Sequence, residues 1–158
     1  MRVILIIAGL LVSLFSFSSM ASNAPDIFKT DSYNKLITQT QEPFIMVLWS
    51  LDCPPCIKEL DMLGALYKQN PRLNLVLVST DSMSRLDEIN TLIEKSGLHG
   101  LDNRVFSDES VQRLRYSIDP GWYGELPRSY FHGKNNSQRS AVSGLLDTDK
   151  IVAWLGIN

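Results

Sequence analysis

The sequence predicts an α/β fold in which helices flank a central mixed sheet. Two apolar segments, residues 44–49 and 73–79, have the composition of buried strands, and a helical pattern lies between them. Strands joined in this way by a helix pair in parallel through a right-handed crossover. Residues 126–131 and 139–143 also have strand patterns, and the turn-rich stretch 133–136 joins them, which predicts an antiparallel hairpin. A sheet that contains both kinds of pairing is mixed.

Capping and helix-breaking residues mark the first elements. Asp31 or Ser32 can cap a helix near the start of the globular part. The apolar face of this helix consists of Tyr33, Leu36 and Ile37. Pro43 then marks the entry to the first clear strand, and Asn70 and Pro71 end the helix that follows it.

The segment between the second strand and the hairpin is expected to contain a helix, a short strand and a second helix. Ser84 is the expected cap of the first of these helices, and Gly97 is its expected stop. The short strand is centred on residues 105–106, and Asp108 opens the next helix. After the hairpin, Asp147 caps a final helix. We expect one module, because no linker or repeat divides these elements.

The first residues have the pattern of a signal peptide. Arg2 gives a short positive start, the run 3–17 is apolar, and small residues around Ala21 suit a signal peptidase. We therefore expect residues 1–21 to be removed and residues 22–158 to form the mature domain. The alternative is an uncleaved membrane anchor, but the apolar run is shorter than the roughly 20 residues that a spanning helix needs.

Export and net charge limit the classes of partner. Cleavage after residue 21 deletes one of the 15 basic residues and none of the 17 acidic ones, which leaves a net charge of −3. This balance argues against nucleic acid or an anionic membrane as a partner. We expect a periplasmic or otherwise exported protein. Such a compartment is oxidising, so a cysteine pair there forms a disulfide unless it is actively reduced.

The two cysteines of the chain, Cys53 and Cys56, lie where the first clear strand gives way to a helix. A thiolate is the attacking species in disulfide exchange, and the unpaired N–H groups of a helix N-terminus stabilise it. Cys53 is placed to be that thiolate. Pro54 and Pro55 lie in the first helical turn, where a missing N–H costs little. At about 100° per residue, Cys56 falls on the apolar stripe of the helix and should be the more buried sulfur.

Two other roles for the cysteine pair are less well supported. A structural disulfide that closes a loop of roughly 4 residues contributes only about 2 kcal/mol by chain entropy. A zinc site needs two further ligands, for which only the scattered His99 and His132 are available. Haem attachment is excluded because Ile57 stands where a histidine is required. The pattern therefore favours redox chemistry, with no metal.

Several features together resemble the thioredoxin fold. These are a strand that ends in Trp49, a Cys-x-x-Cys at the next helix start, Leu126-Pro127 before a late strand, a hairpin and a final helix. The extra helix-strand-helix between Asp81 and Pro120 is similar to the insertion of the TlpA/ResA-like branch of exported bacterial thiol-disulfide oxidoreductases. The resemblance covers nearly all of the mature chain.

The resemblance implies roles for individual residues. Cys53 attacks the substrate and Cys56 resolves the mixed disulfide. Pro127 is cis and packs beside the dithiol, and the backbone around it, including Leu126, pairs with substrate. Glu59 matches an acid three residues after the second cysteine. Because Glu59 lies a further ~60° round the helix, beyond Cys56, we interpret it as an acid-base aid to Cys56; the alternative is a solvated helix glutamate.

The sequence also departs from this family. Asp52 stands where an aromatic residue often precedes the first cysteine, Asp61 where a proline is common, and Arg128 where Thr or Ser follows the cis-proline. Asp52 is either a helix cap or a charge that raises the pKa of Cys53. Arg128 either offsets that charge or is an exposed strand arginine. These departures leave the potential and the substrate open.

Aromatic residues flank the expected site. Trp122 and Tyr123 lie in the loop ahead of Pro127, where they form either an apolar lip for a partner polypeptide or ordinary loop packing. Trp49 is expected to be a core residue that supports the dithiol. We therefore take Trp122, together with Leu126 and Pro127, as candidate substrate-binding residues.

These observations predict an exported protein-disulfide oxidoreductase with no cofactor beyond its own dithiol. By the resemblance, it reduces protein thiol/disulfide substrates such as cytochrome c precursors, and a membrane electron donor keeps it reduced. We expect it to be a monomer. The alternative is a non-catalytic thioredoxin-fold binding or chaperone module in which the disulfide is structural.

Overall fold

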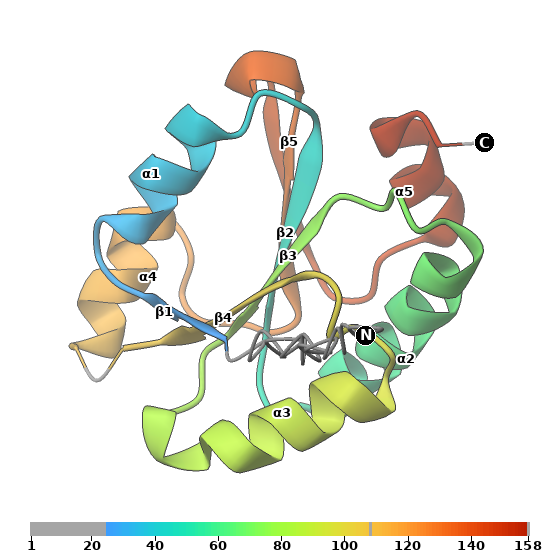
Figure 1. The fold of residues 1–158 in the computed structure, drawn as a ribbon. Coiled ribbons are helices and arrows are strands. Elements are labelled where there is room, and N and C mark those ends of the chain that lie inside the picture. The colour runs from blue at the N-terminus through green and yellow to red at the C-terminus, as the bar shows by residue number, and fades with distance from the viewer. Residues whose placement is uncertain (1–24, 108, 158) are drawn as a thin grey trace, which may run out of the picture.

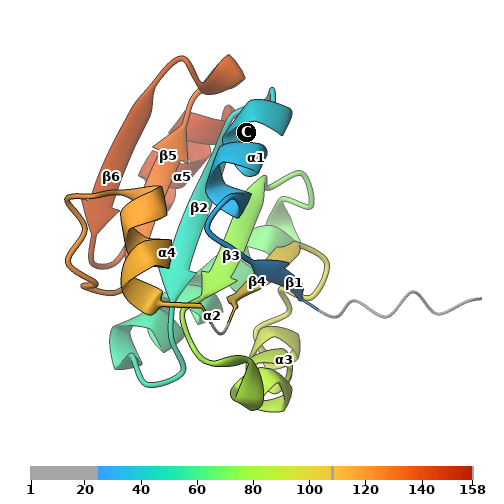
Figure 2. The same ribbon diagram turned by 90° about the vertical axis from the view of Figure 1, so that its left-hand side faces the viewer.

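In the computed structural model, which describes residues 25–107 and 109–157, six strands form one sheet in the order β1-β4-β3-β2-β5-β6 (Figures 1 and 2). The strands are β1 (Asp26–Phe28), β2 (Phe44–Trp49), β3 (Leu75–Ser79), β4 (Asp102–Phe106), β5 (Arg128–His132) and β6 (Arg139–Ser143). The helices are α1 (Ser32–Gln39), α2 (Pro54–Gln69), α3 (Leu86–Lys95), α4 (Val111–Ile118) and α5 (Thr148–Leu155). Two 3-10 turns, η1 (Met83–Arg85) and η2 (Lys134–Asn136), complete the order.

The sheet is mixed, as predicted. The pairs β1–β4, β4–β3 and β3–β2 are parallel, whereas β2–β5 and β5–β6 are antiparallel. The carboxyl ends of β2, β3 and β4 therefore meet at one edge of the sheet. Because Leu48 near the end of β2 lies opposite Arg128 at the start of β5, the segment that leads into β5 reaches the same edge.

Each face of the sheet has its own core, because alternate side chains of β2 point to opposite faces. Ile45, Val47 and Trp49 pack with α2, α3 and α5, and Phe44, Met46 and Leu48 pack with α1 and α4. The helices contribute Leu60, Leu63, Ile89, Ile93 and Ile151 to the first cluster and Tyr33, Leu36, Leu114 and Ile118 to the second. Figure 1 shows the two groups of helices on opposite sides of the strands.

The predicted elements are present, and their boundaries differ for local reasons. The strand 44–49 is confirmed, whereas β3 begins two residues later than expected because the Leu73 N–H donates to the Asn70 carbonyl in a turn. Ser84 is not a helix cap: its N–H donates to the side chain of Ser82, which caps η1 instead. Asp147 does cap α5, through a hydrogen bond from the Lys150 N–H (3.1 Å).

Two strands differ more from expectation. β1 was not predicted, because three residues are too few to show a period. β4 extends back to Asp102, where polar residues hide the strand pattern. Asp108, the expected start of the following helix, lies outside the described residues, and Ser110 occupies the N-cap position of α4.

The expected signal peptide, residues 1–21, also lies outside the described residues. Within residues 25–107 and 109–157, no helix combines the length and apolar character needed to cross a membrane.

Candidate active site

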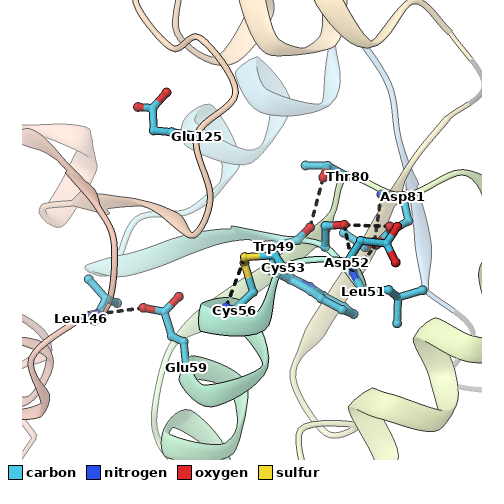
Figure 3. Close-up of a disulfide and its surroundings, with 12 residues drawn as sticks. Trp49, Leu51, Asp52, Cys53, Cys56, Glu59, Thr80, Asp81, Glu125 and Leu146 are labelled. Atoms are coloured by element: carbon cyan, nitrogen blue, oxygen red, sulfur yellow. Dashed lines mark hydrogen bonds between the residues drawn. A yellow bond between two sulfur atoms is a disulfide. The ribbon is translucent and has the colours of Figure 1, made fainter.

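Cys53 and Cys56 form a disulfide at the start of α2, directly after the central strand (Figure 3). Cys53 occupies the N-cap position, where its Sγ accepts a hydrogen bond from the Cys56 N–H (3.2 Å). Pro54 and Pro55 occupy the first turn, so α2 begins without unpaired N–H groups at those positions. Cys53 is partly exposed, whereas Cys56 is 0% exposed. The predicted difference in burial between the two sulfurs is confirmed.

Glu59 is buried on the same helix, with 1% of its surface exposed. Its Oε1 accepts a hydrogen bond from the Leu146 N–H (2.9 Å), and Figure 3 shows the carboxylate turned from α2 toward Leu146. Burial raises the pKa of Glu59 to about 7, and the hydrogen bond from Leu146 opposes part of this shift. The alternative of a solvated helix glutamate is therefore wrong. At neutral pH this carboxyl group can both accept and donate a proton.

The peptide bond between Leu126 and Pro127 is cis, as the resemblance implies. Pro127 is buried, and its carbonyl accepts a hydrogen bond from the Gly144 N–H (2.9 Å). Because Pro127 directly precedes β5, whose first residue lies opposite the end of β2, it reaches the sheet edge that carries the disulfide. The loop between β6 and α5 thus contacts both Pro127, through Gly144, and Glu59, through Leu146.

The turn before Cys53 is held by a buried carboxylate, that of Asp81. Asp81 follows β3 and is 8% exposed. Its Oδ2 accepts hydrogen bonds from the Leu51 N–H (2.9 Å) and the Ser79 hydroxyl (2.7 Å), and its Oδ1 accepts one from the Ser50 hydroxyl (2.9 Å). Figure 3 shows Asp81 and Leu51 on the far side of the disulfide from Glu59.

Asp52 pairs with an arginine from the next element and does not cap α2. Its Oδ2 accepts a hydrogen bond from Nη1 of Arg85 (2.7 Å), while Cys53 is the N-cap. Arg85 also donates two hydrogen bonds to Glu88 (3.1 and 3.0 Å). Hydrogen bonds to Glu88 and Asp52 hold the pKa of Arg85 above its ordinary value.

No protein-family model matches the chain, and no curated protein matches it at a significant level. Solved structures do match. A thiol:disulfide interchange protein from Chlorobium tepidum is 14% identical, with a TM-score of 0.58 over 78% of this chain and 83% of that one. A secreted disulfide oxidoreductase of Mycobacterium tuberculosis, described as homologous to DsbE of E. coli, is 15% identical (TM-score 0.53; 75% and 84% covered). StoA from Bacillus subtilis is 18% identical (TM-score 0.51; 73% and 83% covered).

The protein has the thioredoxin fold. Within this thioredoxin fold, the expected insertion is present as α3, β4 and α4, and β4 lies between β1 and β3 in the sheet. The insertion matters for the site because Asp81 and Arg85 lie in the segment that leads into it.

Arg128 does not offset the charge of Asp52, and it is not an exposed strand residue. Its side chain is 15% exposed. Its guanidinium donates to Asp119 (3.2 Å), Glu125 (3.2 Å) and Ser143 (2.6 Å). These hydrogen bonds join the segments on either side of Pro127, so Arg128 stabilises the loop that contains the cis peptide. The cation that pairs with Asp52 is Arg85.

Trp122 is buried, at 4% exposed, and its Nε1–H donates to the Glu125 carbonyl (2.9 Å). The apolar-lip interpretation is therefore wrong for Trp122, which packs in the core cluster of α1 and α4. Its neighbour Tyr123 is 91% exposed. Trp49 is a core residue of the cluster that contains Cys56, as predicted.

The two histidines do not join the dithiol site. His99 is exposed, and His132 is buried between Tyr33 and Asn136, where burial lowers its pKa. Among residues 25–107 and 109–157, no group of three or more His, Cys, Asp or Glu is arranged to hold a metal ion.

Sequence reasoning missed Asp81 and Arg85. One signal could have found Asp81, because it lies two residues after β3, the strand that pairs in parallel with β2. The carboxyl ends of parallel neighbours meet at one sheet edge, so a polar residue there reaches the turn before Cys53.

Proposed function

We propose that the protein is an exported thiol-disulfide oxidoreductase that exchanges disulfides with protein substrates through Cys53 and Cys56. The observation that carries this proposal is the asymmetry of the pair. One sulfur is partly exposed at a helix N-terminus and receives an N–H, while the other is buried one turn later. A partly exposed sulfur at a helix start is the environment of a reactive cysteine.

The exchange proceeds in two balanced steps. The reduced protein attacks with the Cys53 thiolate, a bond forms between Cys53 Sγ and one substrate sulfur, and the second substrate sulfur leaves as a thiolate. The Cys56 thiolate then attacks Cys53 Sγ, which forms the Cys53–Cys56 disulfide and releases the first substrate sulfur. Two electrons pass from the protein to the substrate, and both substrate thiolates take up protons from the solvent or a neighbouring acid.

Glu59 is the acid-base partner that we propose for the second step. Cys56 must lose its proton before it attacks, and it is sealed from water. Glu59 is buried on the same helix three residues later, with a pKa of about 7. It can therefore receive the proton in the pH range in which the reaction runs.

We propose that substrate polypeptides bind along the backbone around Leu126 and Pro127. This segment reaches the sheet edge that carries the disulfide, because β5 begins opposite the end of β2, and Leu126 packs against both core clusters. Trp122 does not belong to this binding surface, because it is buried.

The direction that we propose is reduction of substrates, with a membrane electron donor to restore the dithiol. Its support is the similarity to the TlpA/ResA-like branch, whose insertion corresponds to α3, β4 and α4. The same similarity, the apolar first residues and the secreted neighbour from M. tuberculosis support export after cleavage near residue 21.

Trapping of mixed disulfides tests the proposed function. In Cys56→Ala, the second step is blocked, so partner proteins should accumulate on Cys53 as adducts that dithiothreitol releases. Adducts are measured on non-reducing gels and identified by mass spectrometry. The matched control is Cys53→Ala, which should trap none. Failure of Cys56→Ala to trap any thiol protein would favour the binding or chaperone alternative.

A further inference from the structure

We propose that Arg85 sets the ionisation of the Cys53 thiol by offsetting the negative charge of Asp52, and that Asp81 holds the turn that makes this arrangement. The inference rests on the proposed role of Cys53 as the attacking thiol. Arg85 and Asp81 contact neither sulfur, so both are positioning residues.

The turn from Ser50 to Cys53 is fixed by hydrogen bonds at every step. The Cys53 N–H donates to the Ser50 carbonyl (3.2 Å), and the Asp52 N–H donates to the Ser50 hydroxyl oxygen (3.2 Å). The Leu51 N–H and the Ser50 hydroxyl both donate to Asp81. The position of Cys53 at the start of α2 therefore depends on a carboxylate in the segment that follows β3.

Asp81 places a second negative charge beside this turn, and its side chain is only 5% exposed. Arg85 reaches both carboxylates with one nitrogen: Nη1 lies 2.7 Å from Asp52 Oδ2 and 3.4 Å from Asp81 Oδ1. The other two guanidinium nitrogens donate to the two oxygens of Glu88. A planar guanidinium held at three points has a defined orientation, so the positive charge stays next to Asp52.

The charges in this arrangement have opposite effects on a thiolate at residue 53. A carboxylate on the adjacent residue raises the pKa of the thiol, and a nearby cation lowers it. Two other charged residues lie around the dithiol: Glu59 on α2, whose carboxylate turns toward Leu146, and Glu125 on the loop before Pro127, which is paired with Arg128 (Figure 3). Arg85 differs from these groups because it donates a hydrogen bond to Asp52, the residue directly before Cys53.

The test measures the thiol directly. In a Cys56→Ala background, Cys53 is the single thiol of the full chain, and its rate of alkylation by iodoacetamide against pH gives its pKa. Arg85→Met should raise the midpoint of this pH dependence by about half a pH unit. The shift is small because the Arg85–Asp52 ion pair is partly exposed to solvent. Arg85→Lys keeps the charge and should stay near the parent, and Asp52→Asn should lower the midpoint.

The double variant Asp52→Asn/Arg85→Met loses one charge of each sign and should return within about 0.2 pH unit of the parent. Arg104→Met is the matched control. This substitution breaks the ion pair between Arg104 and Asp102 on β4. In the sheet, β4 lies two strands away from β2, at about 5 Å per strand, so the midpoint should stay unchanged.

A midpoint in Arg85→Met that equals or falls below the parent value overturns the proposal, as does an equal rise in Arg85→Lys. If Arg85→Met does not fold, Asp52→Asn decides, because an unchanged midpoint there also overturns it. Alkylation requires no protein substrate. A clear shift together with no trapped partner would therefore refute the proposed function and leave the electrostatic role of Arg85 in place.

Discussion

Glu59 places an ionisable carboxyl group inside the core that surrounds Cys56, and this position gives it two properties. The group is 1% exposed and receives one backbone hydrogen bond, from Leu146, so its charged form is poorly solvated and its pKa rises from 4.5 to about 7. A raised pKa suits proton exchange with a thiol near neutral pH. It also means that ionisation of Glu59 opposes folding.

Stability should therefore depend on pH through Glu59. The pKa of Glu59 is higher in the folded state than in the unfolded state. The stability that protonated Glu59 contributes is therefore fully present below pH 4.5 and is lost as the pH rises through 7. Glu59→Gln cannot ionise. The unfolding free energy of Glu59→Gln minus that of the wild type should increase by up to about 3 kcal/mol between pH 4.5 and pH 8. Urea unfolding of the oxidised proteins at both pH values measures this difference.

Glu94→Gln on α3 is the control for that experiment, because the residue is exposed, and its difference from the wild type should stay constant. The same Glu59→Gln protein tests the acid-base role: release of a small thiol from the mixed disulfide on Cys53 should slow by roughly 10-fold or more at pH 7. A release rate and pH profile equal to those of the wild type would show that Glu59 takes no part in the proton transfer.

At the residue scale, the sequence predicts the features that lie within one helix and leaves out those that join distant segments. The order of burial of Cys53 and Cys56 follows from helical geometry alone. The contact of Arg85 with Asp52 joins residues 33 positions apart and depends on the path of the chain after β3. A single sequence contains no pattern for such a pair.

At the element scale, Gly64 controls how closely α2 approaches the end of α3. A Cβ atom at this position would lie 1.8 Å from the carbonyl oxygen of Ser96, which is backbone and cannot move aside alone. Gly64→Ala should therefore push the two helices apart and lower the unfolding free energy by about 2–3 kcal/mol. Thermal or urea unfolding of the oxidised protein measures the loss.

Gly97→Ala is the comparison for Gly64→Ala. Gly97 has a φ of +71°, and a Cβ there meets no atom of the described residues within 4 Å. Its replacement should cost only the left-handed backbone conformation, about 1 kcal/mol. A loss in Gly64→Ala no larger than that in Gly97→Ala would show that the helices separate freely.

The elements that the sequence predicts well are those with several buried residues in a regular period. All six residues of β2 are buried, and α2 carries its apolar stripe over 16 residues. β1 has three residues, of which one is buried, so it is too short to show an alternating pattern of apolar and polar residues. Ser84 fits the capping pattern, but it lies inside the 3-10 turn that Ser82 caps, and Arg85 occupies the N-cap position of α3. The start of a helix is therefore harder to predict than the helix itself, because a short 3-10 turn can precede it and move its first residue.

At the scale of the whole molecule, the redox state of the dithiol and the stability of the fold are linked. Reduction breaks the Cys53–Cys56 bond and creates a new ionisable group at the N-terminus of α2, next to the turn held by Asp81. The difference in unfolding free energy between the oxidised and reduced proteins therefore equals, by a thermodynamic cycle, the difference in disulfide stability between the folded and unfolded chains. Each 1.4 kcal/mol in that difference corresponds to about 30 mV in potential.

This link provides a test of direction that needs no substrate. A strong oxidant, with a potential near −120 mV, has a reduced form that is stabilised by folding. For a reductase we expect the opposite order, so that the oxidised protein unfolds at a higher urea concentration than the protein held reduced by dithiothreitol. Circular dichroism at pH 7 measures both midpoints, and Cys53→Ala/Cys56→Ala, which has no thiol, controls for effects of dithiothreitol itself. A reduced form that is the more stable of the two would assign the protein to oxidation of its substrates, with the same two sulfurs carrying electrons in the opposite direction.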